Sequence, residues 1–406
     1  MNYNRLSKTL PAIKGLAMLM IVNFHIWGGT KGGFLTIPEI FTRYQGAGIK
    51  GFIEGLISVV CSLGEYGVHI FIIASGFGLA ASWWRKYGND SNSKDQLAAL
   101  PFWKRRLSRI FPLYWMAHGL ALVIGMINLE LIPRRDLFTL GIFDSLTALI
   151  ASLTTLRNFS VDYNSFINSA WWYVGLAIQF YLVFPLLIRV GKRWGWSNLL
   201  LISLAVNLFY RVVIIALPLE AKLTSIYLRG ALFPTRLFEF VFGIVLAISL
   251  LDNRDLRPAK SFKTSFHWIK LLVIERRFLY LNLILYVIGI AFDAAADEGY
   301  LSYKIFADVL LGVGEFSLFF HLFNSIPKLK IAFNPIGNFS YGIYLTHMNT
   351  LGLFWIWLLP WLPSYWLRFG VVSLLCCCFG ALFEYLYNSL TINFIQKKVS
   401  SQTKSI

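Results

Sequence analysis

The feature that most limits how this chain can fold is a succession of long apolar stretches. Each is about 20 residues long, the length that an α-helix needs to cross the hydrocarbon core of a bilayer. We identify ten candidate spans: 9–28, 64–84, 108–129, 170–190, 196–217, 230–251, 278–296, 302–325, 336–360 and 365–390. Residues 139–159 are moderately apolar, and we expect an interfacial or bundle-packed helix there. The sequence therefore predicts an all-α, polytopic integral membrane helix bundle with about ten transmembrane helices.

Composition excludes the soluble alternatives. Hydrophobic residues make up 57% of the 406 residues and charged residues only 14%, whereas a soluble domain carries about 25% charged residues. This excludes a disordered chain and an ordinary cytosolic enzyme. Cys61 and the run 376–378 lie in apolar sequence without metal-ligand spacing, so we expect buried structural thiols and no metal site.

The net charge of +17 follows the predicted topology. With a cytoplasmic N-terminus and ten crossings, 25 of the 37 Lys and Arg residues fall on the cytoplasmic side, as the positive-inside rule requires. We therefore expect both termini to be cytoplasmic and no nucleic-acid partner. The first span begins like a signal peptide, but no cleavage motif follows Trp27, so we expect a retained anchor. One membrane domain is predicted over 1–395, with a short polar cytoplasmic tail over 396–406.

Lys14 and His25 are the most informative ionisable residues in the spans. Eleven residues make almost three helical turns, so the two side chains share one face, about 16 Å apart along the axis. Ionisable groups at membrane depth usually face a cavity or a partner. The alternative is a snorkelling lysine and a histidine that is hydrogen-bonded at a helix interface.

A cluster of cations precedes the third span, in the segment Phe102-Trp-Lys-Arg-Arg-Leu-Ser-Arg-Ile-Phe-Pro. Arg105 and Arg109 share a helix face, with Arg106 beside them, and guanidinium groups match phosphate oxygens. The cluster is therefore either the binding site of a phosphorylated cytosolic cofactor or a stop-transfer signal that fixes orientation.

Other polar segments allow two interpretations each. Ser75-Gly76 follows His69 in an apolar helix and serves close helix packing, although Ser75 could line a channel. Arg236 and Glu239 stand at i, i+3, where they form a structural pair or take part in catalysis. His347 ends the segment that opens the ninth predicted span.

These segments, in this order, resemble the membrane-bound acyltransferase 3 family. The resemblance covers roughly residues 8–390 and also rests on the stretch from Trp172 through Gln179-Phe-Tyr181 and on Gly337-x-x-Ser-Tyr-x-x-Tyr344-Leu-x-His347. It implies an integral membrane enzyme that moves an acyl group, often acetyl, from cytoplasmic acyl-CoA to a hydroxyl of a cell-envelope or exported carbohydrate. No appended hydrolase-like domain is expected.

The resemblance also implies roles for residues. His25 is the expected catalytic residue, and the donor-binding residues are Lys14, Arg105, Arg106 and Arg109. Cavity-lining or supporting roles are expected for His69, Ser75, Trp172, Tyr181, Arg236, Glu239, Tyr344 and His347. The co-substrate is an acyl-CoA, most often acetyl-CoA, and the other partners are a hydroxyl acceptor and membrane lipid. The expected location is a bacterial inner membrane.

The sequence departs from the family pattern at two places. Lys14 stands where the family has an arginine, and Ala177 and Ile178 replace a pair of glutamates. Direct transfer with His25 as general base is the expected mechanism, with a covalent acyl-histidine relay left open. The competing hypotheses are a transporter or lipid-linked sugar flippase without chemistry, and a sensor or scaffold that has lost the activity.

Overall fold

The computed structural model describes residues 2–31, 33–87, 98–131, 141–252 and 268–403, and side chains as far as Thr391. Within those ranges the secondary structure is helical, with no strand. The longer helices are α1 (Asn2–Thr30), α3 (Gly48–Ser62), α4 (Gly67–Tyr87), α5 (Ala99–Ile127), α7 (Trp172–Trp194), α8 (Trp196–Ala216), α10 (Leu237–Leu251), α12 (Leu279–Asp297), α13 (Lys304–Ser325), α15 (Ser340–Leu358) and α16 (Tyr365–Thr403). The shorter ones are α2 (Ile37–Tyr44), α6 (Ile142–Leu153), α9 (Ala221–Arg229), α11 (Trp268–Ile274) and α14 (Leu329–Asn338).

The predicted class, an all-α membrane helix bundle, is confirmed. Nine helical stretches of the described chain are long and apolar enough to cross a membrane: Asn2–Thr30, Gly48–Tyr87, Ala99–Ile127, Ser169–Trp194, Trp196–Ala216, Phe233–Leu251, Arg276–Asp297, Leu301–Ser325 and Tyr365–Thr391. The moderately apolar segment at 139–159 contains the short helix α6, as expected. The predicted polar tail lies partly within α16, which continues to Thr403.

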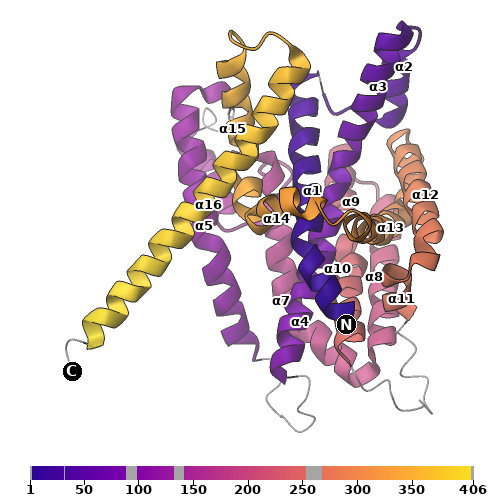
Figure 1. The fold of residues 1–406 in the computed structure, drawn as a ribbon, viewed down its shortest axis with the longest axis vertical. Helices are drawn as coiled ribbons and strands as arrows, with labels where there is room; N and C mark the ends of the chain where they lie inside the picture. Colours follow the sequence, from indigo (N-terminus) through magenta and orange to yellow (C-terminus); the bar gives the residue numbers. More distant parts are fainter. Residues whose placement is uncertain (1, 32, 88–97, 132–140, 253–267, 404–406) are drawn as a thin grey trace.

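The ninth predicted span, 336–360, is not one helix. The chain breaks at Phe339, between α14 and α15. Figure 1 shows α14 lying across the front of the bundle, almost perpendicular to α1. The sequence reason is local: Pro335, Gly337 and Ser340 follow one another closely, and such residues favour a turn or helix end over a continuous helix.

Helix α1 stands at the centre of the bundle and joins two apolar clusters. Its first half, including Ile13 and Ala17, packs with residues of α4, α7, α10 and α13. Its second half, including Ile21 and Ile26, packs with α5, α15 and α16. Because the cavity described below lies between helices of both clusters, α1 can present side chains to it along one face.

Glycines allow the helices around α1 to approach closely. A Cβ at Gly76 of α4 would lie 2.0 Å from the carbonyl oxygen of Phe240, and a Cβ at Gly243 of α10 would lie 2.1 Å from that of Ile73. The predicted packing role of Gly76 is therefore correct. A similar crossing joins α1 to α14, where a Cβ at Gly15 would lie 2.0 Å from the carbonyl oxygen of Phe333. These crossings bring α1, α4, α10 and α14 into backbone contact.

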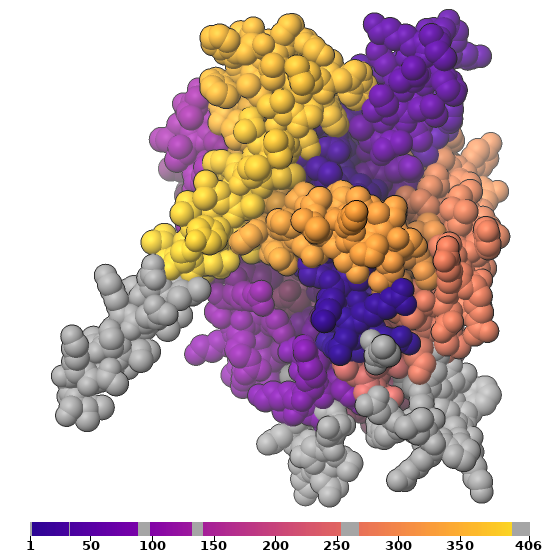
Figure 2. Space-filling model, viewed as in Figure 1, coloured from indigo at the N-terminus to yellow at the C-terminus, as the bar shows by residue number. Residues whose placement is uncertain are grey.

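Helix α16 leaves the bundle. It starts beside α15 at the upper end in Figure 1 and slopes away from the other helices toward its C-terminal end. In the space-filling view its described part forms the left shoulder of the molecule, beside the band formed by α14 and its neighbours (Figure 2). Its residues Glu384, Tyr387, Asn388 and Thr391 form one wall of the main cavity.

Candidate active site

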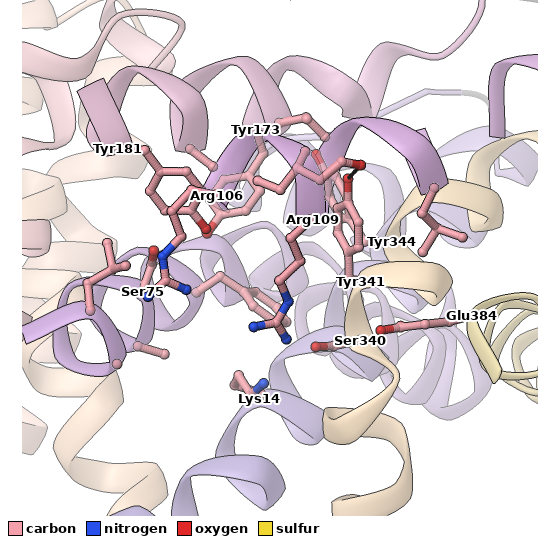
Figure 3. Close-up of a pocket in the computed structure, with 18 of the residues that line it drawn as sticks. Lys14, Ser75, Arg106, Arg109, Tyr173, Tyr181, Ser340, Tyr341, Tyr344 and Glu384 are labelled. Atoms are coloured by element: carbon pink, nitrogen blue, oxygen red, sulfur yellow. Dashed lines mark hydrogen bonds between the residues drawn. The ribbon is translucent and has the colours of Figure 1, made fainter. Parts of the chain in front are cut away.

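A cavity of about 680 Å³ opens between α1, α4, α5, α7, α15 and α16. Its cationic residues are Lys14 of α1 and Arg106 and Arg109 of α5, and Figure 3 shows these three side chains reaching toward the same space. Glu384 supplies the one carboxylate among the described lining residues. Three cations against one anion in a low-dielectric wall attract a polyanionic guest.

Arg105 faces a second, smaller pocket of about 370 Å³, which shares Arg106 and Arg109 with the main cavity. Its walls are aromatic as well as basic: they include Trp83, Tyr87, Phe102 and Phe184, with Lys86. The rings of Phe102 and Phe184 stack with centroids 5.3 Å apart, and the Arg106 guanidinium lies 5.6 Å from the centroid of Phe102. Flat rings next to cations suit a planar base that carries phosphates.

Glu384 ties α16 to the start of α15. Its Oε2 accepts a hydrogen bond of 2.7 Å from the backbone N–H of Gly342, in the first turn of a helix, where a carboxylate is favoured. Lys14 and Arg109 are close enough to Glu384 to attract it electrostatically. Lys14 therefore lies near a carboxylate and next to Gly15, where α1 crosses α14.

His25 forms a pair with His347 of α15. Nε2 of His347 lies 3.2 Å from Nδ1 of His25, and the ring centroids are 5.0 Å apart. Neither residue lines the main cavity. Tyr344 connects the two regions, because it lines the cavity and its ring lies 5.7 Å from that of His347.

The backbone assigns the tautomer of each histidine in this pair. Nδ1 of His25 lies 2.9 Å from the carbonyl oxygen of Ile21, and Nδ1 of His347 lies 2.8 Å from that of Tyr344. A carbonyl oxygen only accepts, so both Nδ1 atoms carry a proton. The one proton on Nδ1 of His25 is then shared between the Ile21 carbonyl oxygen and Nε2 of His347. Nε2 of His25 then carries a free lone pair, and no residue in the described ranges hydrogen-bonds to it.

Of the expected supporting residues, Ser75, Tyr181 and Tyr344 line the main cavity. Trp172 does not. Its carbonyl oxygen accepts a hydrogen bond of 2.8 Å from Asn158, which fixes the start of α7, while its neighbour Tyr173 faces the cavity. Both roles considered for this segment therefore occur, at adjacent residues: Ser75 lines the cavity, and Gly76 packs against α10.

His69, Arg236 and Glu239 belong to a separate buried ionic network. Arg236 lies 3.6 Å from Glu239 and 3.0 Å from Asp308, so the predicted i, i+3 pair is confirmed. His69 contacts Glu239, and the network continues through ion pairs of Asp308 with Arg211 and of Lys304 with Asp293. None of these residues lines the cavity, and their geometry suits a structural role.

Sequence reasoning missed several residues of both sites. Glu384 faces the cavity, and Arg211 and Asp308 are central to the ionic network. All three stand inside predicted spans, where a charged residue is rare, so their charge alone could have marked them as candidate site or ion-pair residues. Ala177 also faces the cavity, so a glutamate at this position, as in the family pattern, would add a carboxylate there.

The fold and cavity define a membrane helix bundle with a basic chamber and a pair of histidines near it. The chain belongs to the acyltransferase 3 family: the family model described as an acyltransferase domain matches residues 9–383. The resemblance inferred from the motifs is confirmed.

A curated relative is also an acyltransferase by name. The chain is similar to acyltransferase MdmB of Streptomyces mycarofaciens, with 27% identity over 208 residues, which cover 47% of this chain and 48% of that protein. The match thus spans about half the length of that relative. No solved structure matches the chain.

Proposed function

We propose that this protein is an integral membrane O-acyltransferase. It moves an acyl group, most simply acetyl, from a cytoplasmic acyl-CoA to a hydroxyl of a cell-envelope or exported carbohydrate, in a bacterial inner membrane. Family membership supports the reaction class. The observation that carries the proposal is a basic cavity that is lined in part by Tyr344, whose ring lies 5.7 Å from that of His347 in the histidine pair.

The donor's charged end is assigned to the arginines. Lys14, Arg106 and Arg109 neutralise phosphate groups in the main cavity, and Arg105 does so in the adjoining pocket. Both volumes lie within the range of about 300–1,000 Å³ that small-molecule sites occupy. The pantetheine arm then runs along the cavity toward Tyr344, which brings the thioester to the histidine pair.

His25 acts as the general base in this proposal. Its free Nε2 takes the proton of the acceptor hydroxyl while the hydroxyl oxygen attacks the thioester carbonyl carbon. The new C–O bond forms, the C–S bond breaks, and CoA leaves as a thiolate that recovers a proton. A positioned base of this kind accelerates such a step by about 10²–10⁴-fold. The hydrogen bond to His347 keeps His25 in the tautomer that this step needs.

The test is acyl transfer in membranes that contain the protein. Membranes are incubated with radiolabelled acetyl-CoA, and label in envelope glycan is counted for wild type and for His25→Ala at matched protein levels. We expect His25→Ala to lose the labelling. His321→Ala is the matched control, since His321 is also buried in a spanning helix but outside the site, and it should label like wild type.

Each contrary result has a definite meaning. Wild-type labelling by His25→Ala would make His25 structural. Glycan that reaches the outer face without label in the wild type would favour a flippase over an acyltransferase.

A further inference from the structure

Phe34 lies beside the proposed base although it belongs to a loop. The loop joins α1 to α2, and the ring of Phe34 folds back on α1. Its centroid is 4.8 Å from that of Phe24 and 6.0 Å from that of His25, edge to face. The side chain is 51% exposed, so the ring has one side on α1 and the other at the surface.

Gly28 allows the Phe34 ring to pack directly on α1. A Cβ at Gly28 would lie 2.2 Å from two carbon atoms of the Phe34 ring, a separation that no real packing allows. The ring therefore rests directly on the α1 backbone, one turn beyond His25. Even an alanine at position 28 must displace it.

The two aromatic neighbours of His25 differ in burial. His347 is fully buried, whereas Phe34 is half exposed, so Phe34 is the aromatic neighbour of His25 that also reaches the surface of the protein. The loop continues from the end of α1 farthest from Lys14. The Phe34 ring rests on α1 at Gly28, which is one turn closer to that end than His25, so an acceptor that approaches along α1 from that end meets the ring.

We propose that Phe34 is a specificity-determining residue that keeps water away from His25 until an acceptor hydroxyl displaces the ring. The inference rests on the proposed function. Its physical basis is competition: water is far more concentrated than any glycan, and a base that activates a hydroxyl also activates water. Exclusion of water is therefore what makes the reaction a transfer and not a hydrolysis.

The side reaction that Phe34 suppresses is hydrolysis of the thioester, and its atoms balance without a further reactant. The oxygen of water attacks the thioester carbonyl carbon, and Nε2 of His25 takes the proton. The C–O bond forms as the C–S bond breaks, which gives acetate and the CoA thiolate, and the thiolate is then protonated. No further reactant is needed.

The test measures release of the free CoA thiol from acetyl-CoA by purified protein in lipid nanodiscs, without an added acceptor. Phe34→Ala removes the ring, and Gly28→Ala keeps the ring but displaces it. We expect both variants to release thiol several-fold faster than wild type. In membranes, both should incorporate less label into glycan per thiol released. Phe34→Tyr retains the ring and should behave like wild type.

Two controls make the result specific. Phe41→Ala removes another exposed phenylalanine, 63% exposed, from the neighbouring helix α2, and it should leave thiol release unchanged. The double variant His25→Ala/Phe34→Ala should lose the added hydrolysis, because water is then no longer activated.

The inference is overturned if Phe34→Ala and Gly28→Ala release thiol at the wild-type rate. It is also overturned if Phe41→Ala accelerates release equally, or if the added hydrolysis persists without His25. Wild-type membranes that never label glycan would instead contradict the proposed function, and the role of Phe34 with it.

Discussion

Arg109 occupies the place where the two basic pockets meet. It lines both the main cavity and the smaller aromatic pocket, whereas Arg105 lines only the smaller one. The nearby Lys104 is exposed and lines neither. Lys104, Arg105 and Arg109 thus have different surroundings on one helix, which allows their contributions to be separated.

We expect Arg109→Ala to raise the acyl-CoA concentration that gives half-maximal transfer before it lowers the limiting rate. Hydrogen bonds to charged groups are worth about 1.5–3 kcal/mol, so the increase should be about tenfold or more. Arg105→Ala should act in the same direction. The measurement is the initial transfer rate against acetyl-CoA concentration, with Lys104→Ala as the control.

If the donor dependence of Arg109→Ala equals that of Lys104→Ala, the cluster serves only to orient the chain in the membrane.

The sequence predicted these basic residues better than it predicted their acidic partner. Lys14 could be identified because an ionisable residue inside an apolar span is rare. The arginines could be identified because they cluster at one span and guanidinium groups match phosphate oxygens. Glu384 lies about 370 residues from Lys14 along the chain, so nothing local links the two. Their proximity depends on how α16 packs on α15, which hydropathy does not encode.

At the scale of the element, the bundle depends on crossings at which glycine lets two helix backbones touch. Hydropathy located the helices well, because the bilayer demands apolar stretches of a fixed length. It could not identify the break at Phe339, since the residues on both sides are apolar enough to continue a span. The glycine positions explain how closely α4 approaches α10 and α1 approaches α14.

Gly76→Ala should destabilise the protein although alanine usually strengthens a helix. Its Cβ would lie 2.0 Å from the carbonyl oxygen of Phe240, and overpacking of this kind costs about 1–3 kcal/mol. Gly119→Ala is the control, because a Cβ at that position of α5 meets no atom within 4 Å. Thermal unfolding in detergent should show a lower midpoint for Gly76→Ala only. Equal midpoints for the two variants would contradict the close crossing of α4 and α10.

At the scale of the whole molecule, two polar regions are separate: the basic cavity and the ionic network around Asp308. The cavity has an excess of cations and is open to a ligand, whereas the ionic network around Asp308 pairs its charges and is buried. Asp308 contacts Arg211 and Arg236 and lies 3.5 Å from Lys304. One carboxylate therefore joins α8, the start of α10 and α13.

Asp308→Asn should lower stability without changing donor affinity. Loss of one member of a buried ion pair costs about 3–5 kcal/mol, because the partner charges remain buried. The midpoint of thermal unfolding should fall well below that of Asp144→Asn, a control at an exposed site on α6. The acyl-CoA dependence of the surviving protein should match wild type. A raised acyl-CoA requirement would place this network in donor binding.

The crossings of α1 have a consequence for how the substrates meet. Gly15 of α1 touches the backbone of α14, and a Cβ at Gly67 of α4 would lie only 2.6 Å from the carbonyl oxygen of Ala17 in α1. Backbones in such contact cannot slide or rock past each other without separating first. We therefore expect α1 to keep its position relative to α4 and α14 when ligands bind. Under the proposed function, thioester and alcohol each travel to a stationary imidazole from opposite sides, and only the small groups around it shift during turnover.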